Sequence, residues 1–330
     1  MPTSPATKVL AGPPSLGELE AAAAIVYKAM PPTPQRSWPL INKRAGTEVW
    51  VKHENHTPIG AFKVRGGLVY ADWLRREYPE VTGIVSATRG NHGQSLAYAA
   101  RQFGLQAVLV VPHGNSKEKN AAMRGFGAEL VEHGEDFHAA DHHSHELARE
   151  RGLHKVDPFN WLLVHGVGTY AMELFRGAPQ LDAVYVPIGW GSGICGVAAA
   201  RNALHLKTKI IAVVSAQAPS FALSLAAGKS VEQQSRTRIA DGMAISHPHE
   251  DSLRWLGTQL ERVVQVTDDE VEAAMRIYFA DTHNVAEGAG ATSLAALLQE
   301  KDKMAGKRVA VVVSGGNVDR DVYVRVLGKS

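Results

Sequence analysis

Short apolar runs of strand length recur along the chain, and stretches with the periodicity of amphipathic helices separate them. The runs are residues 47–54, 82–87, 106–112, 182–189, 209–216 and 308–316. Several are rich in valine and isoleucine without polar alternation, which is typical of strands buried on both faces of a parallel sheet. The helical stretches are residues 94–103, 117–125, 136–151, 194–203 and 268–279. This alternation predicts an α/β fold with wound parallel sheets.

The composition is that of an ordinary globular protein. The 330 residues are 45% hydrophobic and 21% charged, enough for one large or two ordinary domains. A net charge of +2, with scattered basic residues, gives no support for a nucleic-acid or membrane-surface partner. The single cysteine, Cys195, favours a reducing compartment. Residues 1–14 lack the features of a signal peptide, and no apolar run approaches the ~20 residues that span a bilayer, so we expect a cytoplasmic protein.

Polar, glycine-bearing clusters follow several of the predicted strands, at residues 88–93, 189–193 and 314–317. Ligands of open α/β sheets bind beyond the carboxyl ends of strands, where loops meet helix N-termini. The clusters therefore predict a cradle for a polar ligand. The segment 189–193 could hold a phosphate through its backbone N–H groups, although tight packing alone also explains such a turn. It matches neither a nucleoside-triphosphate loop nor a dinucleotide fingerprint.

Lys63 is the candidate nucleophile. Most lysines are solvated, but this one lies in the apolar, glycine-bracketed segment 57–67, which reads as a loop entering a buried helix. Burial would lower the pKa of the ammonium and make the amine available for Schiff-base formation.

Together these features resemble the fold-type II pyridoxal-phosphate enzymes, in particular the serine/threonine dehydratase and serine racemase group. The matching stretches are residues 57–67, 87–97, 186–196, 238–245, 266–271, 286–296 and 312–319. The resemblance implies two wound parallel-sheet domains of the tryptophan synthase β-like kind, with the cofactor between them. It places a large domain at 1–81 plus 159–330 and a small domain at 82–158. It implies a homodimer and, at this chain length, no C-terminal regulatory domain.

The resemblance also implies roles for individual residues. Lys63 would hold pyridoxal 5'-phosphate and move the substrate's α-proton, Phe62 would pack on the ring, and Asn91 would bond the phenolic oxygen. The phosphate would be bound by the backbone of Gly189, Trp190, Gly191, Ser192 and Gly193. The substrate carboxylate would be bound by Thr88, Arg89, Asn91 and His92. Ser314 would bond the pyridine nitrogen without protonating it, which favours prompt β-elimination over transamination. Glu287 and Gly288 match a family segment near the site, but a helix-capping or salt-bridged role for Glu287 is equally open.

The chain departs from the family pattern in several places. Arg89 stands where the racemases have a serine acid/base, and because its pKa stays above ~12 it argues against racemase activity. Arg89 either clamps a carboxylate or points outward. Ser215 and Phe221 replace carboxylates at the family's divalent-cation site, so we expect no metal there. Trp190 and Ser192 replace glycines in the phosphate loop, where the indole would reshape the cofactor pocket or a subunit contact.

Other polar features have plainer interpretations. His138, His142, His143 and His145 include a pair with metal-ligand spacing, but a solvated helix face is the favoured interpretation. Cys195 is interpreted as a packing residue. Asp241 and Gly242 are interpreted as a structural turn, which the resemblance places near the cofactor.

The predicted function is α,β-elimination of a β-hydroxy-α-amino acid to a 2-keto acid and ammonia. Threonine or serine is the default substrate, with phenylserine kept open. Arg89 mildly favours a dicarboxylic alternative, 3-hydroxyaspartate. The remaining alternatives are a β-replacement synthase on the same fold and a non-catalytic ligand-binding protein.

Overall fold

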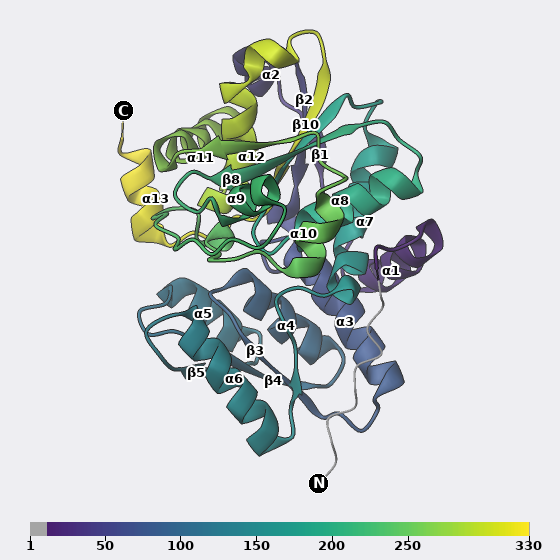
Figure 1. The fold of residues 1–330 in the computed structure, drawn as a ribbon, viewed down its shortest axis with the longest axis vertical. Coiled ribbons are helices and arrows are strands. Elements are labelled where there is room, and N and C mark those ends of the chain that lie inside the picture. The colour runs from purple at the N-terminus through teal and green to yellow at the C-terminus, as the bar shows by residue number, and fades with distance from the viewer. Residues whose placement is uncertain (1–11, 330) are drawn as a thin grey trace.

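The computed structural model describes residues 12–329 as two parallel-sheet layers with helices on both faces of each sheet (Figure 1). The six-stranded sheet runs β1 (Gln35–Ser37), β2 (Glu48–His53), β10 (Arg308–Val313), β7 (Ala183–Pro187), β8 (Lys209–Ser215) and β9 (Arg262–Val266). Its neighbours are parallel except for β1, which pairs with β2 in the antiparallel direction. The N-terminal expectation about a signal peptide falls mainly on residues 1–11, outside the described part.

The four-stranded sheet runs β5 (Glu129–Glu132), β4 (Gln106–Val111), β3 (Gly83–Ala87) and β6 (His154–Lys155), and all of its pairs are parallel. It lies below the larger sheet in Figure 1, with α4 (Asn91–Gln102), α5 (Lys117–Gly125) and α6 (Phe137–Arg151) around it. These two sheets confirm the predicted α/β class with wound parallel sheets. The short strands β1, β5, β6 and β9 were not predicted.

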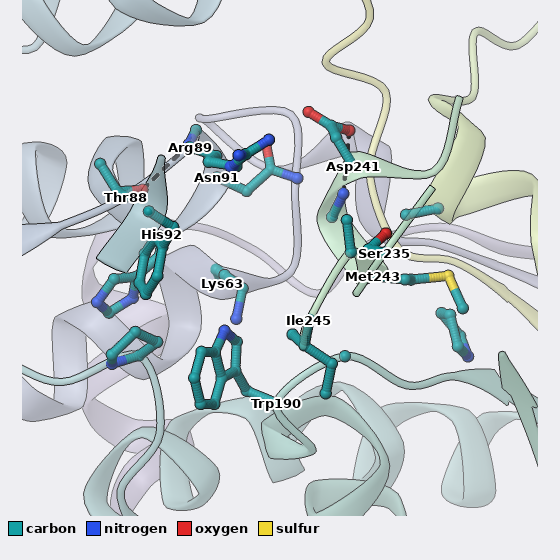
Figure 2. Close-up of a pocket in the computed structure, with 18 of the residues that line it drawn as sticks. Lys63, Thr88, Arg89, Asn91, His92, Trp190, Ser235, Asp241, Met243 and Ile245 are labelled. Atoms are coloured by element: carbon teal, nitrogen blue, oxygen red, sulfur yellow. Dashed lines mark hydrogen bonds between the residues drawn. The ribbon is translucent and has the colours of Figure 1, made fainter. Parts of the chain in front are cut away.

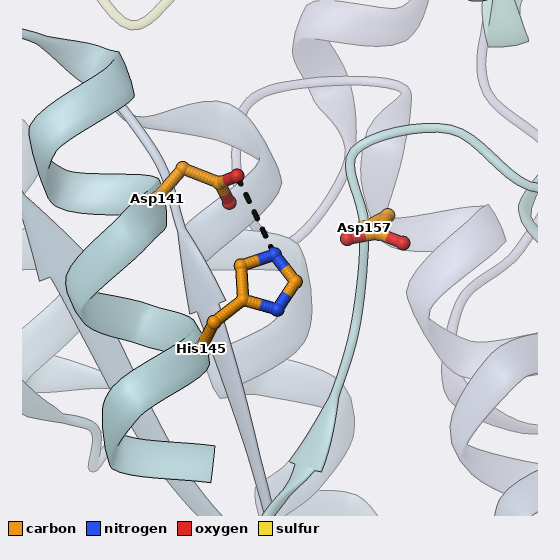
Figure 3. A group of neighbouring side chains, drawn as sticks. All are labelled: Asp141, His145 and Asp157. Atoms are coloured by element: carbon orange, nitrogen blue, oxygen red, sulfur yellow. Dashed lines mark ion pairs between the residues drawn. The ribbon is translucent and has the colours of Figure 1, made fainter. Parts of the chain in front are cut away.

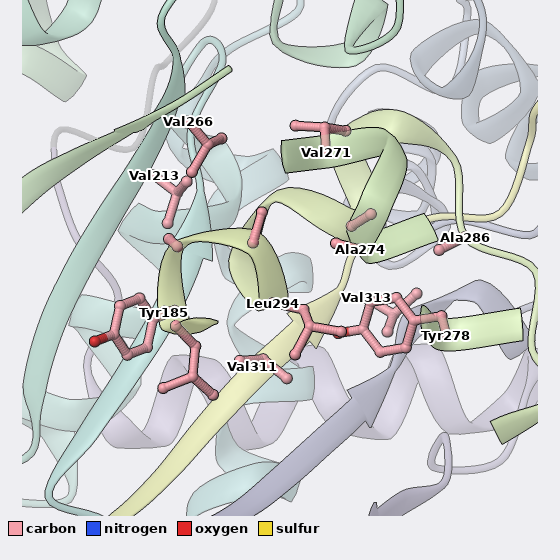
Figure 4. Close-up of a cluster of buried hydrophobic side chains, with 14 of the residues drawn as sticks. Tyr185, Val213, Val266, Val271, Ala274, Tyr278, Ala286, Leu294, Val311 and Val313 are labelled. Atoms are coloured by element: carbon pink, nitrogen blue, oxygen red, sulfur yellow. The ribbon is translucent and has the colours of Figure 1, made fainter. Parts of the chain in front are cut away.

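The alternation of side chains along each strand builds the core. On β10, Val309, Val311 and Val313 face the helices on one side of the larger sheet, and Ala310 and Val312 face the helices on its other side. The helices on the first side are α2 (Pro39–Ala45), α11 (Asp268–Thr282), α12 (Gly288–Gln299) and α13 (Arg320–Leu327). Figure 4 shows its centre, where side chains of the sheet and of α11 and α12 interdigitate. The helices on the second side are α1 (Leu16–Ala29), α7 (Trp161–Gly177), α8 (Ser192–Ala203), α9 (Ser220–Ala227) and α10 (Glu250–Leu256).

Each sheet with the helices packed on it forms a layer, the larger with six strands and the smaller with four, and helix α3 (Lys63–Glu77) connects the two layers. Its apolar residues share a core with the smaller sheet, although the predicted division assigns 1–81 to the large domain. Because this core is shared, the boundaries at 82 and 158 stay a prediction. Among residues 12–329 no helix combines the length and the apolar character that crossing a membrane requires.

A largely buried charge network fixes the start of α3. Arg65 donates to Glu54 (Nε–Oε2 2.7 Å) and to Glu173 on α7 (Nη1–Oε1 2.6 Å). Lys52 of β2 pairs with the second oxygen of Glu173 at 2.6 Å. Cations and carboxylates balance within the network, which is the condition for burying such charges. The network ties together β2, α3 and α7 at a point two residues from Lys63.

Candidate active site

A cavity of about 280 Å³ lies between the two sheets, at the carboxyl ends of their strands. The loop 88–93 follows β3, the loop 189–193 follows β7, and Ser314 follows β10. The cavity is lined by Phe62, Lys63, Thr88, Arg89, Asn91, His92, Gly189, Trp190, Gly191, Ser192, Gly193, Glu287 and Ser314. These are the residues proposed from the sequence, with one exception. Gly288 packs on the backbone of Ile239, where no side chain would fit, and is not part of the lining.

Lys63 is the first residue of α3 and projects into the cavity (Figure 2). Its Nζ lies 3.5 Å from the Ser192 hydroxyl and 5.1 Å from the centre of the Phe62 ring. Among the described residues, no carboxylate forms an ion pair with it. Burial lowers the pKa of Lys63 to about 8, and the more distant charge of Glu287 opposes that shift. Roughly one in ten of these side chains is therefore a neutral, nucleophilic amine at pH 7, far more than for a lysine with the usual pKa of about 10.4.

The loop 189–193 has the geometry of an anion cradle. Gly191 has φ +107°, a conformation that favours glycine, and a side chain there would collide with Ser252. Helix α8 begins at Ser192 without a side-chain cap, so the N–H groups of its first turn stay available. A helix N-terminus with free N–H groups favours a bound phosphate.

The loop 88–93 is held in shape from within. The Thr88 hydroxyl accepts hydrogen bonds from the backbone N–H of Gly90 (3.0 Å) and of Gly93 (2.9 Å). His92 is buried, and burial holds the pKa of its imidazole well below the usual value, so the ring is neutral. Its Nε2 has no hydrogen-bond partner among the described residues. Arg89 is exposed at the cavity edge and forms no ion pair within residues 12–329.

Asn91 is oriented from both ends of its amide. Its Nδ2 donates to Glu287 Oε1 at 2.6 Å, and its Oδ1 accepts from Asn317 at 2.9 Å. Glu287 is 2% exposed, and burial raises the pKa of its carboxyl, while the neighbouring Lys119 acts in the opposite direction. The sequence left two interpretations of Glu287 open, a salt-bridged carboxylate and an acid near the active site. The structure shows both features together, because Glu287 pairs with Lys119 and lines the cavity.

Lys119 was not identified from the sequence. Its Nζ lies 2.7 Å from Asp241 Oδ2 and 3.4 Å from Glu287 Oε2, so it bridges the smaller sheet's α5 to the larger layer. The attraction of the two carboxylates raises its pKa despite burial. Its methylene chain lies against Gly90, where a Cβ would be 2.5 Å from Lys119 Cδ. Asp241, interpreted as part of a structural turn, is therefore also a member of this cavity network.

The histidines of α6 do not share one environment, and His143 departs from the predicted solvated face because its ring is partly buried against that of His133, 3.9 Å away between centroids. His142 and His145 have side chains that are 78% and 54% exposed, as expected for a solvated face. His138 differs, because it lines the cavity and its Nε2 lies 3.2 Å from the Ser246 hydroxyl. Helical periodicity could not reveal this, since a cavity wall and a solvated face present the same polar pattern. Cys195 is buried among apolar side chains, as predicted.

One cluster among residues 12–329 has the spacing of metal ligands, namely Asp141, His145 and Asp157 (Figure 3). Lys155 already bridges its two carboxylates, with Nζ–Oδ1 distances of 2.8 Å to Asp141 and 3.0 Å to Asp157. The ammonium therefore occupies the position that a cation would take. Ser215 and Phe221, which the sequence resemblance compares with a cation site, are both buried and offer no carboxylate.

The residues present fit pyridoxal phosphate. The cavity brings a lysine with a lowered pKa close to the N-terminus of α8, where a phosphate would be stabilised. The Ser314 side chain faces the same cavity and has no charge that would protonate a ring nitrogen. The backbone N–H of Phe62 donates to the carbonyl of Ser314 at 3.0 Å, which fixes these two lining residues relative to each other.

Comparison with known proteins agrees with this geometry. The family profile described as pyridoxal-phosphate dependent enzyme matches residues 26–315. L-threonine ammonia-lyase of Thermotoga maritima is 32% identical over 291 residues, covering 88% of this chain and 72% of that protein. A biosynthetic L-threonine dehydratase of Haemophilus influenzae is 33% identical, and the alignment covers 89% of this chain but only 58% of that protein. The serine racemase structure from Dictyostelium discoideum superposes with a TM-score of 0.84 at 30% identity, covering 92% of this chain and 99% of that one. These matches confirm the expected family and cofactor, and the chain belongs to the pyridoxal-phosphate dependent enzymes.

Proposed function

We propose that this chain catalyses α,β-elimination of a β-hydroxy-α-amino acid, giving a 2-keto acid and ammonia. The observation that carries the proposal is the position of Lys63. Its amine has a lowered pKa, lies 3.5 Å from the first residue of α8, and faces the loop 88–92 across one cavity. The likeness to threonine ammonia-lyase and threonine dehydratase supports threonine or serine as the default substrate class.

Different residues of the chain would bind the substrate, remove its α-proton and position the cofactor. When bound, the cofactor supplies a carbonyl for the substrate's amine and a conjugated ring that withdraws electrons from the α-carbon. The turn around Thr88 presents backbone and side-chain donors to the substrate carboxylate. Lys63 removes the α-proton, and its burial in the cavity keeps it neutral enough to act as a base. Asn91 is fixed by Glu287 and Asn317, and in this position it would hold the cofactor's phenolic oxygen.

The overall reaction balances without an oxidant. The α-carbon loses a proton and the β-carbon loses hydroxide, so one water leaves. Hydrolysis of the resulting enamine then consumes one water and releases ammonia and the keto acid.

The test is release of keto acid and ammonia by the purified, cofactor-loaded protein. The panel is L-threonine, L-serine, phenylserine and 3-hydroxyaspartate, with the D-isomers as controls. We expect release from at least one member and none from Lys63→Ala. Activity that survives Lys63→Ala would show that the central assignment is wrong.

The rival functions have their own outcomes in this test. Silence from the whole panel, with normal cofactor absorbance, would favour a β-replacement synthase, and a second nucleophile should then raise turnover without keto-acid release. A protein that stays colourless after cofactor soaking would instead favour a non-catalytic ligand-binding role. A homodimer and a cytoplasmic location are also proposed, on the family resemblance, and light scattering tests the first.

A further inference from the structure

Aromatic rings from separate elements meet at one end of the cavity. Phe137, at the start of α6, lies 6.0 Å from Trp190 between ring centroids, with the planes tilted by 46°. His247 lies 5.6 Å from Trp190 on its other side, at 86°. Phe137 comes from the smaller layer, whereas Trp190 and His247 come from the larger one. Phe137 and Trp190 both line the cavity.

The fold covers these rings only in part. None of the three is fully buried, and Trp190 stands in a loop whose phosphate donors are backbone N–H groups. The phosphate cradle does not require the indole, which leaves part of its aromatic surface facing the cavity. Covering such surface with another ring is favourable, both by removing it from water and through edge-to-face contacts.

The cations in the cavity lie elsewhere, and the charged group next to Phe137 is the carboxylate of Asp136. The cations in its lining are Lys63, Arg89 and Lys119, and Lys119 is already paired with Asp241 and Glu287. Figure 2 shows Arg89 and Trp190 on opposite sides of Lys63. A second carboxylate on the substrate would therefore meet aromatic rings at this end instead of a free cation.

The rings line the same cavity as the reacting lysine. With its carboxylate in the loop 88–92 and its α-carbon at Lys63, the substrate lies where its β-substituent can reach Phe137 and Trp190. We infer that Phe137 and Trp190, with His247 packed against Trp190, form a subsite for an aromatic ring on the β-carbon. The preferred substrates are then β-aryl-β-hydroxy-α-amino acids, of which phenylserine is the simplest.

This inference rests on the proposed elimination and makes its chemistry specific. In phenylserine the α-proton and the β-hydroxyl leave as water, and hydrolysis then gives phenylpyruvate and ammonium. The same subsite, however, can be tested without any reaction.

The first experiment is calorimetric titration of the cofactor-loaded protein with unreactive analogues. L-phenylalanine, L-2-aminobutyrate and L-aspartate are phenylserine, threonine and 3-hydroxyaspartate without the hydroxyl. We expect phenylalanine to bind at least about tenfold more tightly than the other two, since each aromatic contact contributes a factor of about 2 to 13. Tighter binding of aspartate or 2-aminobutyrate would overturn the inference.

Variants then locate the effect. Phe137→Leu and Trp190→Gly should each weaken phenylalanine binding about tenfold, whereas His142→Ala, on the exposed face of the same helix as Phe137, should leave it unchanged. If Trp190→Gly fails to fold or to load cofactor, Phe137→Leu alone decides. Tighter phenylalanine binding in either variant would mean that the rings fill the space instead of forming a subsite.

Turnover separates this inference from the proposed function. The ratio of kcat/KM for phenylserine to that for threonine should exceed one and fall about tenfold in Phe137→Leu. Silence toward every substrate, together with preferential phenylalanine binding, would overturn the elimination but leave the subsite standing. Threonine turnover without any preference for phenylalanine would leave the elimination standing and overturn the subsite.

Discussion

Lys119 Nζ lies 3.4 Å from Glu287 Oε2, and this contact joins the smaller layer to the carboxylate that orients Asn91. The cation and the carboxylate are both almost completely buried, and the chain segments that carry them are far apart in sequence. A buried carboxylate without a cation takes up a proton readily, because desolvation disfavours its charged form. Lys119 therefore helps to determine the protonation state of Glu287, and through it the orientation of the Asn91 amide toward the cofactor site.

We predict that Lys119→Met weakens cofactor binding by about tenfold, equivalent to roughly 1.4 kcal/mol. Without the ammonium, the pKa of Glu287 should rise further and its hold on Asn91 should change. The measurement is the cofactor dissociation constant, read from absorbance, together with the absorbance spectrum between pH 6 and 9. Lys117→Met is the matched control, because Lys117 is exposed on the same helix. Equal affinities in the two variants would show that Lys119 serves packing alone.

The buried network around Arg65 gives a prediction for stability. Arg65→Met leaves Glu54 and Glu173 with unbalanced charge in the interior, and breaking such a pair costs about 3–5 kcal/mol. Urea unfolding of the apoprotein measures the free energy of unfolding.

Arg76→Met is its control on the same helix, since Arg76 is 60% exposed and pairs with Asp72 at the surface. An exposed pair of this kind contributes less than about 1 kcal/mol. Similar losses for both variants would contradict the assigned difference between buried and exposed charge.

The sequence predicted the fold where burial leaves a strong pattern and missed it where tertiary pairing decides. The valine-rich strand β10 is buried on both faces and was predicted directly. In contrast, β1 and β6 span three and two residues, and only their pairing with β2 and β3 makes them strands. Helix α4 begins at Asn91, three residues before the predicted start, because the loop residue Asn91 already has a helical backbone.

The residues of the site also divide into those that a sequence motif predicted and those that only tertiary contacts bring to the cavity. Lys63, Asn91 and the loop 189–193 were found because each stands in a motif that the chemistry requires. Lys119 lies in the run Lys-Glu-Lys at the start of α5, which is typical of a solvated face. Only the contact between α5 and the larger layer buries it. Phe137 was likewise unremarkable in sequence, since its approach to Trp190 depends on how the two layers meet.

Acid should destabilise the protein through its buried histidines. Burial lowers the pKa of His53 to about 4 from a usual value near 6.5, and its Nε2 accepts a hydrogen bond from Trp38 at 3.0 Å. Between these two values the unfolded chain binds a proton that the folded protein does not, so stability falls as pH drops from about 6.5 toward 4. The loss from His53 approaches about 3 kcal/mol at the acid end.

His53→Gln should flatten this dependence, because an amide oxygen can still accept from Trp38 but does not titrate. Unfolding midpoints between pH 4 and 7 measure the effect, with His142→Gln as the exposed control. A slope identical to that of the unmodified protein would assign the acid sensitivity to other groups.

The rate at which the apoprotein takes up cofactor should report the pKa of Lys63. Attack on an aldehyde requires the neutral amine, so the rate should rise with pH and level off above about 8, where most of the amine is neutral. Glu287→Gln removes a charge that favours the ammonium form, so the midpoint should move to lower pH in that variant. Stopped-flow absorbance measures the rate, and Glu272→Gln, a carboxylate whose ion pairs lie with Lys329 and Arg325, is the control. A midpoint near 10, or a shift to higher pH in Glu287→Gln, would mean that burial does not control this amine.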